Sequence, residues 1–258
     1  MNIIEYEQQQ SIAYVKLNRP DVLNAFNFEM LCELQAIVES IRIHPDIRLV
    51  IITGAGDKAF SVGADLKERQ TLPEPLVKRN LNKFAEVFNA IEALPQPTIC
   101  ALNGYAFGGG LELALACDFR IAAKNAVVGL TETKLGIIPG AGGTQRLPRL
   151  IGEAKALEFI LTAKKVAGEE ALACGLFTQL VEQEHLMQAT ESFANTILQN
   201  APIALQQAKF AIKQGMKVDL QTGLQIERKA YEITLPTEDR IEALNAFVEK
   251  RTPQFKGK

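Results

Sequence analysis

The sequence predicts an α/β fold that is followed by a tail of helices. Two observations predict it. Up to about residue 200, short runs of β-branched and aliphatic residues alternate with longer segments whose apolar residues recur at helical spacing. From Pro202 onward the strand-like runs disappear, and amphipathic helical segments follow one another. We therefore expect an α/β core over residues 1–200 and a helical region over residues 201–258.

Strands are expected where β-forming residues run between turn residues. Ile12–Leu17 is such a run, and it ends at the turn-forming segment Asn18–Asp21. Leu49–Thr53 is almost wholly apolar, which is typical of a strand buried on both faces. The other expected strands are Thr98–Leu102, Phe119–Ala122 and Ala126–Gly129.

Helices are expected where apolar residues share one face. Phe28–Ile43 has such a face, and Asn27 is placed to cap its first turn. Thr71–Lys78 contains two prolines, so we expect a mobile surface loop that leads into a helix over Leu81–Ala93. The helices expected in the tail are Ala204–Gln214, Leu220–Leu235 and Glu238–Lys250, the last with Thr237 as its N-cap.

Composition argues against several classes of function. The 258 residues are 47% hydrophobic and carry a net charge of −2, which gives no basic surface for nucleic acid or anionic membrane. No apolar run approaches the ~18–20 residues of a membrane helix. The first ten residues lack the pattern of a signal peptide, and the four cysteines form no CxxC motif. We therefore expect reduced thiols and a cytoplasmic location.

The chain also lacks the residues of several common catalytic sites. Its two histidines, His44 and His185, argue against a histidine-based metal site and against a Ser-His-Asp triad. Gly54–Ala59 fits the pattern GxGxxA, but the residues after it show no helical period, so a dinucleotide-binding loop is not expected. Chemistry is expected to rest on carboxylates and backbone N–H groups, without metal.

The stretch Gly104–Asp118 joins both kinds of group. A triple glycine, Gly108–Gly110, opens directly into a helical run that contains Glu112. The neighbours of Glu112 are apolar, so its carboxyl group is expected to be buried at a cost in desolvation. The unpaired N–H groups of the helix start would meet negative charge in front of them. Acid–base chemistry on a carbonyl compound needs this combination.

Three further segments complete the candidate site: Gly63-Ala64-Asp65, Glu132, and the glycine-rich Pro139–Gly143. Together they would supply two N–H groups for an oxyanion and two carboxylates around one water. Each has a structural alternative. A glycine triplet is usually a tight turn, a glutamate in such a helix often has a structural partner, and Glu132 can pair with Lys134 at the surface.

The chain contains four long motifs: LNRPDVLNAF (Leu17–Phe26), FSVGADLKER (Phe60–Arg69), NGYAFGGGLELALACD (Asn103–Asp118) and GLTETKLGIIPGAGGTQRLPRLIG (Gly129–Gly152). In this order and at this spacing, they resemble the crotonase, or enoyl-CoA hydratase/isomerase, superfamily along nearly the whole chain. Two tail segments, 211–227 and 236–258, most resemble its methylglutaconyl-CoA hydratase branch.

The resemblance implies a crotonase-like spiral of ββα units with a C-terminal helical trimerisation region, assembled as a trimer or a dimer of trimers. It implies hydration of an enoyl-CoA thioester, either 3-methylglutaconyl-CoA or a short-chain enoyl-CoA. Coenzyme A is then part of the substrate, and no other cofactor is expected. The alternatives are an enoyl-CoA delta-isomerase of the same superfamily and, in a different class, a non-catalytic protein that binds acyl-CoA or RNA.

The resemblance also implies roles for individual residues. The amides of Ala64 and Gly109 match the oxyanion hole, Glu112 matches the base that deprotonates water, and Glu132 matches the acid that protonates the α-carbon. The remaining matches are Gly140 beside the water, Asp65, Leu66 and Lys67 along the coenzyme A channel, and Val22, Leu23 and Ala25 beside the adenine end.

Nucleic acid is not an expected partner. Some eukaryotic members of the methylglutaconyl branch bind AU-rich RNA through lysines on the first helix. Here that segment carries Glu29, Glu33 and Glu39, with only Arg42 as a basic residue. Phosphate contacts need lysine or arginine. The expected partners are an acyl-CoA substrate and further copies of the chain, with no membrane.

Overall fold

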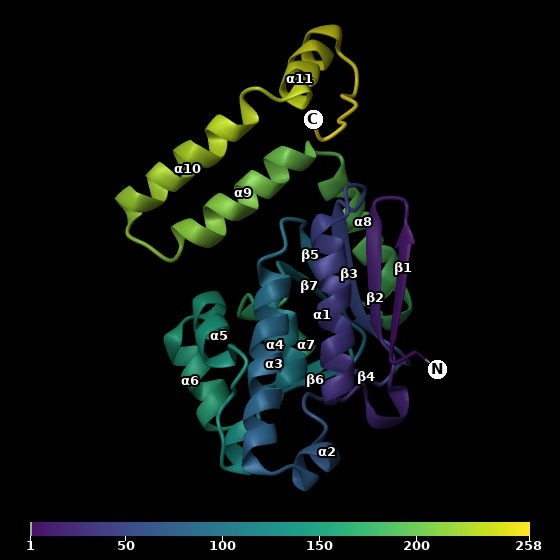
Figure 1. The fold of residues 1–258 in the computed structure, drawn as a ribbon, viewed down its shortest axis with the longest axis vertical. Coiled ribbons are helices and arrows are strands. Elements are labelled where there is room, and N and C mark those ends of the chain that lie inside the picture. The colour runs from purple at the N-terminus through teal and green to yellow at the C-terminus, as the bar shows by residue number, and fades with distance from the viewer. Residues whose placement is uncertain (1) are drawn as a thin grey trace. The chain divides into compact units, whose positions relative to one another are not determined.

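The computed structural model describes residues 2–258, and the chain divides into two compact units (Figure 1). The first unit comprises the described residues up to Leu94 together with Thr98–Glu191, and the second comprises Pro95–Pro97 and Ser192–Lys258. Every strand of the described chain lies in the first unit. The α/β fold with helices at the C-terminal end is therefore as the sequence predicts.

Within residues 2–258, the strands form a six-stranded and a four-stranded sheet. The first two strands of the larger sheet are antiparallel, and its remaining neighbours are parallel. Its order is β1 (Ile4–Gln9), β2 (Ile12–Leu17), β3 (Leu49–Gly54), β5 (Thr98–Leu102), β7 (Phe119–Ala123) and β10 (Gln179–Val181). The smaller sheet has the order β4 (Ala59–Ser61), β6 (Tyr105–Phe107), β8 (Val127–Gly129) and β9 (Val166–Ala167).

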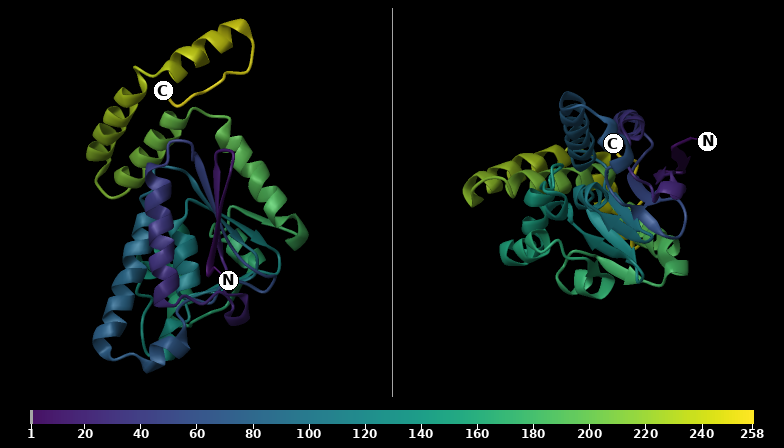
Figure 2. Two further views of the ribbon diagram at one scale, coloured as in Figure 1. Left: turned by 45° about the vertical axis from the view of Figure 1, so that its right-hand side comes forward. Right: turned by 90° about the horizontal axis from the view of Figure 1, so that it is seen from below.

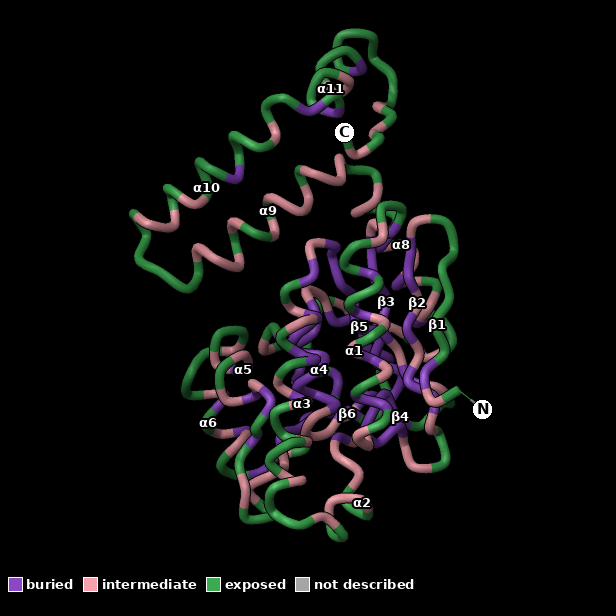
Figure 3. The backbone as a smooth tube through the Cα atoms, viewed as in Figure 1, coloured by how far each residue is buried: buried purple, intermediate pink, exposed green. Residues whose placement is uncertain are grey.

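Helices α1 (Phe28–Ile43) and α3 (Glu74–Glu92) pack against each other beside the larger sheet, as Figure 2 shows. The expected cap of α1 is confirmed, because Asn27 Oδ1 accepts the N–H of Met30 at 3.0 Å. Phe26, Phe84 and Phe88 meet edge to face in the core beneath. The buried residues of the first unit gather in the central strands and in α4 (Figure 3).

The prediction of a loop over Thr71–Lys78 is wrong, because most of that segment forms the start of α3. Pro73 is the N-cap residue of α3, and Pro75 lies at its start. A proline there is favourable, since the first N–H groups of a helix have no intrahelical acceptor. The short helix α2 (Leu66–Thr71) precedes it and is capped by Asp65.

The remaining helices of the first unit place the loops that line the site. The helix α4 (Gly109–Ala116) is buried along nearly its whole length and packs against α3, α5, β4 and β6. The others are α5 (Gly143–Ile151), α6 (Glu153–Leu161) and α7 (Gly168–Ala173), with 3₁₀ turns at Pro20–Val22, Glu132–Leu135 and Gln183–His185. The helix α8 (Leu186–Leu198) begins in the first unit and ends in the second.

The second unit contains the three helices expected in the tail. They are α9 (Pro202–Gly215), α10 (Leu220–Thr234) and α11 (Glu238–Glu249). Thr237 caps α11 as expected, since its hydroxyl accepts the N–H of Arg240. The apolar side chains that share one face of α11 are 52–84% exposed: Ile241, Leu244, Phe247 and Val248. This face has no apolar cover within the single chain that the structure describes.

Two further observations bear on the composition argument. No helix in the described range has both the length and the apolar character needed to cross a membrane. The four cysteines are free thiols, with Cys100 and Cys117 buried and Cys32 exposed.

Gly110→Ala tests the contact of α4 with β4. A Cβ atom at Gly110 would lie 2.0 Å from the carbonyl oxygen of Ser61, so the helix or the strand must move. We expect a loss of about 2–3 kcal/mol in the free energy of unfolding, measured by urea denaturation. Gly215→Ala is the control, because its Cβ would meet nothing closer than 3.8 Å. Equal stability of the two variants would contradict this packing.

Candidate active site

The sequence-predicted site residues all line one cavity of about 1480 Å³ in the first unit. They come from the 3₁₀ turn after β2, the loop after β4, the start of α4, the turn after β8 and the loop before α5. The structure thus brings together Val22, Leu23, Ala25, Ala64, Asp65, Leu66, Lys67, Gly109, Glu112, Glu132 and Gly140.

The carboxyl group of Glu112 is held from one side. The residue is only 3% exposed, and its Oε1 accepts the N–H groups of Ala141 and Gly143, each at 2.8 Å. Burial raises the pKa of Glu112, and the two N–H groups and the charge of Arg146 offset only part of this rise. Among the described residues nothing hydrogen-bonds to Oε2, which leaves this oxygen for a ligand.

Glu132 differs from Glu112 in its surroundings. It starts the 3₁₀ turn after β8, and its Oε2 is buried with no hydrogen-bond partner in the described part of the chain. Burial raises the pKa of Glu132 to about 7, and the negative charge of Glu112 adds to this rise. The surface ion pair with Lys134 is not formed among residues 2–258. Near neutral pH, Glu132 is thus protonated in a large share of the molecules.

Ala64 and Gly109, whose backbone N–H groups are the expected oxyanion donors, line the cavity beside these carboxyl groups. Gly109 begins α4, so its N–H has no acceptor within the helix. Around Ala64, the N–H of Phe26 donates to Gly63 and the N–H of Asp65 donates to Phe26, and neither bond uses the N–H of Ala64. A Cβ atom on Gly63 would lie 2.9 Å from the nitrogen of Gly109, so the two segments adjoin.

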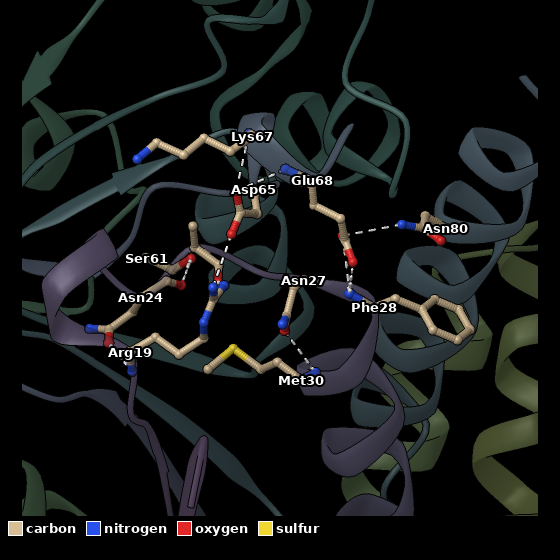
Figure 4. A network of polar contacts seen from close by, with 11 residues as sticks. Arg19, Asn24, Asn27, Phe28, Met30, Ser61, Asp65, Lys67, Glu68 and Asn80 are labelled. Atoms are coloured by element: carbon tan, nitrogen blue, oxygen red, sulfur yellow. Dashed lines mark hydrogen bonds and ion pairs between the residues drawn. The ribbon is translucent and has the colours of Figure 1, made fainter. Parts of the chain in front are cut away.

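A polar network fixes the loop that carries Ala64 (Figure 4). Asp65 Oδ1 accepts the N–H groups of Lys67 and Glu68, and its Oδ2 forms an ion pair with Arg19 at 3.0 Å. Burial disfavours the ionised form of Asp65, but these donors outweigh it and lower the pKa. Arg19 also donates to the carbonyl of Ala25 at 2.6 Å. Through Arg19, Asp65 therefore connects the loop of Ala64 with the segment of Ala25, and both line the cavity.

A second part of this network ties the same loop to the segment after β2. Asn24 is fully buried, and its side chain donates to the carbonyls of Ala55 and Ala59. The Ser61 hydroxyl donates to the carbonyl of Asn24 and accepts the N–H of Gly63. The backbone of Asn24 is left-handed, with φ of 55°, a conformation that asparagine tolerates. These contacts hold the Ala64 peptide in place.

Sequence reasoning missed several residues of the cavity wall. Leu81 and Phe84 of α3 line it. Their spacing of three residues places them on one face of this helix, and this pattern was visible in the sequence. Lys134 and Lys165 line it too: Lys165 lies outside all four motifs, and Lys134 was considered only as a surface partner of Glu132. Within the described range, no cluster of three or more histidine, cysteine or acidic side chains has the arrangement of a metal site.

The family follows from comparison with known proteins. The model of the enoyl-CoA hydratase/isomerase family matches residues 7–258. The protein belongs to the enoyl-CoA hydratase/isomerase family. The expected membership of the crotonase superfamily, and with it the fold, is therefore confirmed.

Individual members of this family are close in sequence and fold. The Bacillus subtilis protein YngF, whose name carries the terms enoyl-CoA hydratase/isomerase, is 53% identical over 97% of this chain and 96% of its own length. The mitochondrial methylglutaconyl-CoA hydratase of Homo sapiens is 45% identical over 97% of this chain and 75% of its own. A crystal structure of an enoyl-CoA hydratase from Bacillus anthracis is 48% identical, with a TM-score of 0.98 over 100% of both chains.

The pKa of Glu132 predicts a pH-dependent gain in stability for Glu132→Gln. In the folded protein the carboxyl group keeps its proton up to about pH 7, while its ordinary value is 4.5. The tighter binding of this proton stabilises the folded state fully below pH 4.5, and this stabilisation is lost as the pH rises through about 7. The neutral variant should thus have a Tm higher by about 2–4 °C at about pH 8.5, the shift being limited by partial exposure.

The same measurement at about pH 5 should show little difference between this variant and the parent protein. Glu153→Gln, at an exposed acid at the start of α6, serves as the control. A Tm difference for Glu132→Gln that stays constant between the two pH values contradicts the raised pKa.

Proposed function

We propose that the protein is an enoyl-CoA hydratase that adds water across the 2,3 double bond of an enoyl-CoA thioester. One observation carries the proposal. Two carboxyl groups, Glu112 and Glu132, line the same cavity as two adjoining backbone N–H groups. Burial raises the pKa of both, and only at Glu112 do two N–H donors from another segment and the charge of Arg146 act against this rise. Family membership supports the same chemistry.

In the proposed mechanism the thioester oxygen accepts the N–H groups of Ala64 and Gly109. Negative charge builds on this oxygen as water attacks, and the positive end of α4 adds to its stabilisation. The donors are held in place before the reaction, since the Asp65 network and the buried helix fix both segments. Such preorganised donors typically contribute a factor of ~10²–10³ each.

The two carboxyl groups then divide the proton transfers. Glu112 takes a proton from water through its unbonded oxygen, and the water oxygen forms a bond to the β-carbon. The π electrons move onto the thioester, and protonated Glu132 gives its proton to the α-carbon. The N–H of Gly140 helps to hold the water. The proposed step needs no metal and no redox cofactor.

The coenzyme A part of the substrate is proposed to lie along the wall nearest α2. Asp65, Leu66 and Lys67 would line its channel, and Val22, Leu23 and Ala25 would lie beside the adenine, since all six residues face the cavity. The apolar face of α11 is exposed in the single chain, and we propose that further copies of the chain cover it in a trimer or a dimer of trimers. A cytoplasmic location fits this proposal.

For the acyl group we propose 3-methylglutaconyl-CoA, with a short-chain enoyl-CoA as the alternative. The human relative at 45% identity is named for the first substrate. The distal carboxylate of 3-methylglutaconyl-CoA needs a cationic side chain as its partner. The cavity wall includes four such residues: Lys67, Arg69, Lys134 and Lys165.

Isomerisation is the competing reaction within the family, and the name of the Bacillus subtilis relative covers both activities. An isomerase moves a proton between two carbons of the same substrate, and one carboxylate suffices for that. The presence of both Glu112 and Glu132 at the cavity favours hydration.

Glu112→Gln and Glu132→Gln test the two carboxyl roles. Each should lower kcat on crotonyl-CoA by ~10²–10⁴, because each removes one proton transfer. Mass spectrometry of the product measures the gain of one water. The control variant Glu153→Gln should hydrate crotonyl-CoA at the parent rate. If both glutamine variants hydrate crotonyl-CoA at the parent rate, the assignment is wrong.

Conversion of a 3-enoyl-CoA without a change in mass would instead indicate an isomerase, and binding without turnover would indicate a non-catalytic acyl-CoA protein.

A matched pair of substrates tests the acyl group. 3-Methylglutaconyl-CoA and 3-methylcrotonyl-CoA differ by the distal carboxylate, so their ratio of kcat/KM reports on a cation in the pocket. We expect at least about a tenfold preference for the carboxylate, the effect of one charge-assisted hydrogen bond. A preference for 3-methylcrotonyl-CoA or for crotonyl-CoA would indicate a short-chain enoyl-CoA hydratase.

A further inference from the structure

We propose that Arg146 is a positioning residue for the reaction, because its guanidinium group clamps the loop that orients Glu112. The inference rests on the proposed role of Glu112 as the base. Arg146 neither hydrogen-bonds to Glu112 nor itself lines the cavity. It acts through the peptide segment Ala141–Gly143, which lies between them.

The guanidinium group joins three elements. Nη1 donates to the carbonyl of Ala141 at 2.9 Å, in the loop before α5. Nε and Nη2 donate to Glu92 Oε2 at 3.1 and 2.8 Å, and Nη2 also donates to Asn89 Oδ1 at 2.7 Å. Glu92 and Asn89 belong to α3, and Arg146 itself belongs to α5. The side chain of Arg146 is only 11% exposed, so its bonds to Ala141 and Glu92 are partly shielded from water, whereas its bond to Asn89 lies at the surface.

The clamp and the carboxyl group bind the same short segment from opposite sides. The carbonyl of Ala141 accepts from Arg146, while the N–H groups of Ala141 and Gly143 donate to Glu112. Between them, Gly142 has φ of 106°, and a Cβ atom there would lie 2.0 Å from Nη1 of Arg146. The guanidinium group therefore packs directly on this peptide. Without it, the loop loses its tie to α3, and the two N–H groups lose their fixed direction.

The charge of Arg146 also reaches Glu112, since it lowers the pKa that burial raises. Glu132 on the turn after β8 interacts with Glu112 by charge, and Glu92 on α3 pairs with Arg146. The other charged residue of α5, Arg149, is exposed. Strand β4 carries no ionisable side chain, and the one on β6, Tyr105, is 43% exposed. Removal of Arg146 should thus raise the pKa of Glu112, whereas removal of the charge on Glu92 should lower it.

Kinetics of four variants on crotonyl-CoA test the proposal. Arg146→Gln should lower kcat by about 10²-fold, as expected for a small displacement of a reacting group, with KM changed by less than about threefold. The acidic limb of kcat/KM should move to higher pH. Arg146→Lys keeps the charge, so it should leave this limb in place and restore part of kcat. Glu92→Gln should move the limb to lower pH. Arg149→Gln, an exposed arginine of the same helix, should match the parent protein.

Amide hydrogen exchange gives a readout that is independent of turnover. Exchange over residues 139–143 should be faster in Arg146→Gln than in the parent protein, and unchanged in Arg149→Gln. Normal kcat, pH profile and exchange in Arg146→Gln would overturn the clamp. If the parent protein hydrates no enoyl-CoA, or if Glu112→Gln is fully active, the proposed function fails instead, and the exchange data still decide whether Arg146 holds the loop.

Discussion

The buried carboxyl group of Glu112 sets the constraint on which the rest of the core depends. A carboxylate at this depth is stable only if donors replace the water that it has lost. The chain supplies two N–H groups of one loop and aims both at a single oxygen. This arrangement leaves the second oxygen with no protein donor among the described residues. The two hydrogen bonds that offset the desolvation of the carboxyl group therefore also fix its orientation. The loop, α4 and α5 must therefore be held in one relative position.

Close approach of backbones satisfies this constraint. Where Gly110 meets Ser61, where Gly63 meets Gly109 and where Gly143 meets Glu112, a Cβ atom would lie at 2.0, 2.9 and 3.0 Å from its neighbour. The first two contacts are between backbones, and the third places the backbone of Gly143 against the carboxyl group of Glu112. The glycines thus have a role beyond turn formation, because they allow peptide N–H groups from segments far apart in the chain to face one space.

Local patterns predicted much of this from the sequence, and long-range contacts account for what was missed. The bounds of α1 and its cap by Asn27 depend on neighbouring residues, so periodicity and capping chemistry were enough. Strands β4 and β6 have three residues each, too few to show an alternating pattern. The site residues came from motifs that are contiguous in sequence. The clamp by Arg146 depends on Glu92, 54 residues away, and the raised pKa of Glu132 depends on burial, so neither has a local signature.

The open apolar face of α11 has a consequence for how the protein behaves in solution. Four large side chains there remain in contact with water in the single chain. Covering them with another chain would release this water and link the integrity of the second unit to mass action. On dilution, the helical unit would then loosen at a temperature at which the sheet-containing unit still holds its core, and heat denaturation would separate into two transitions whose spacing depends on concentration.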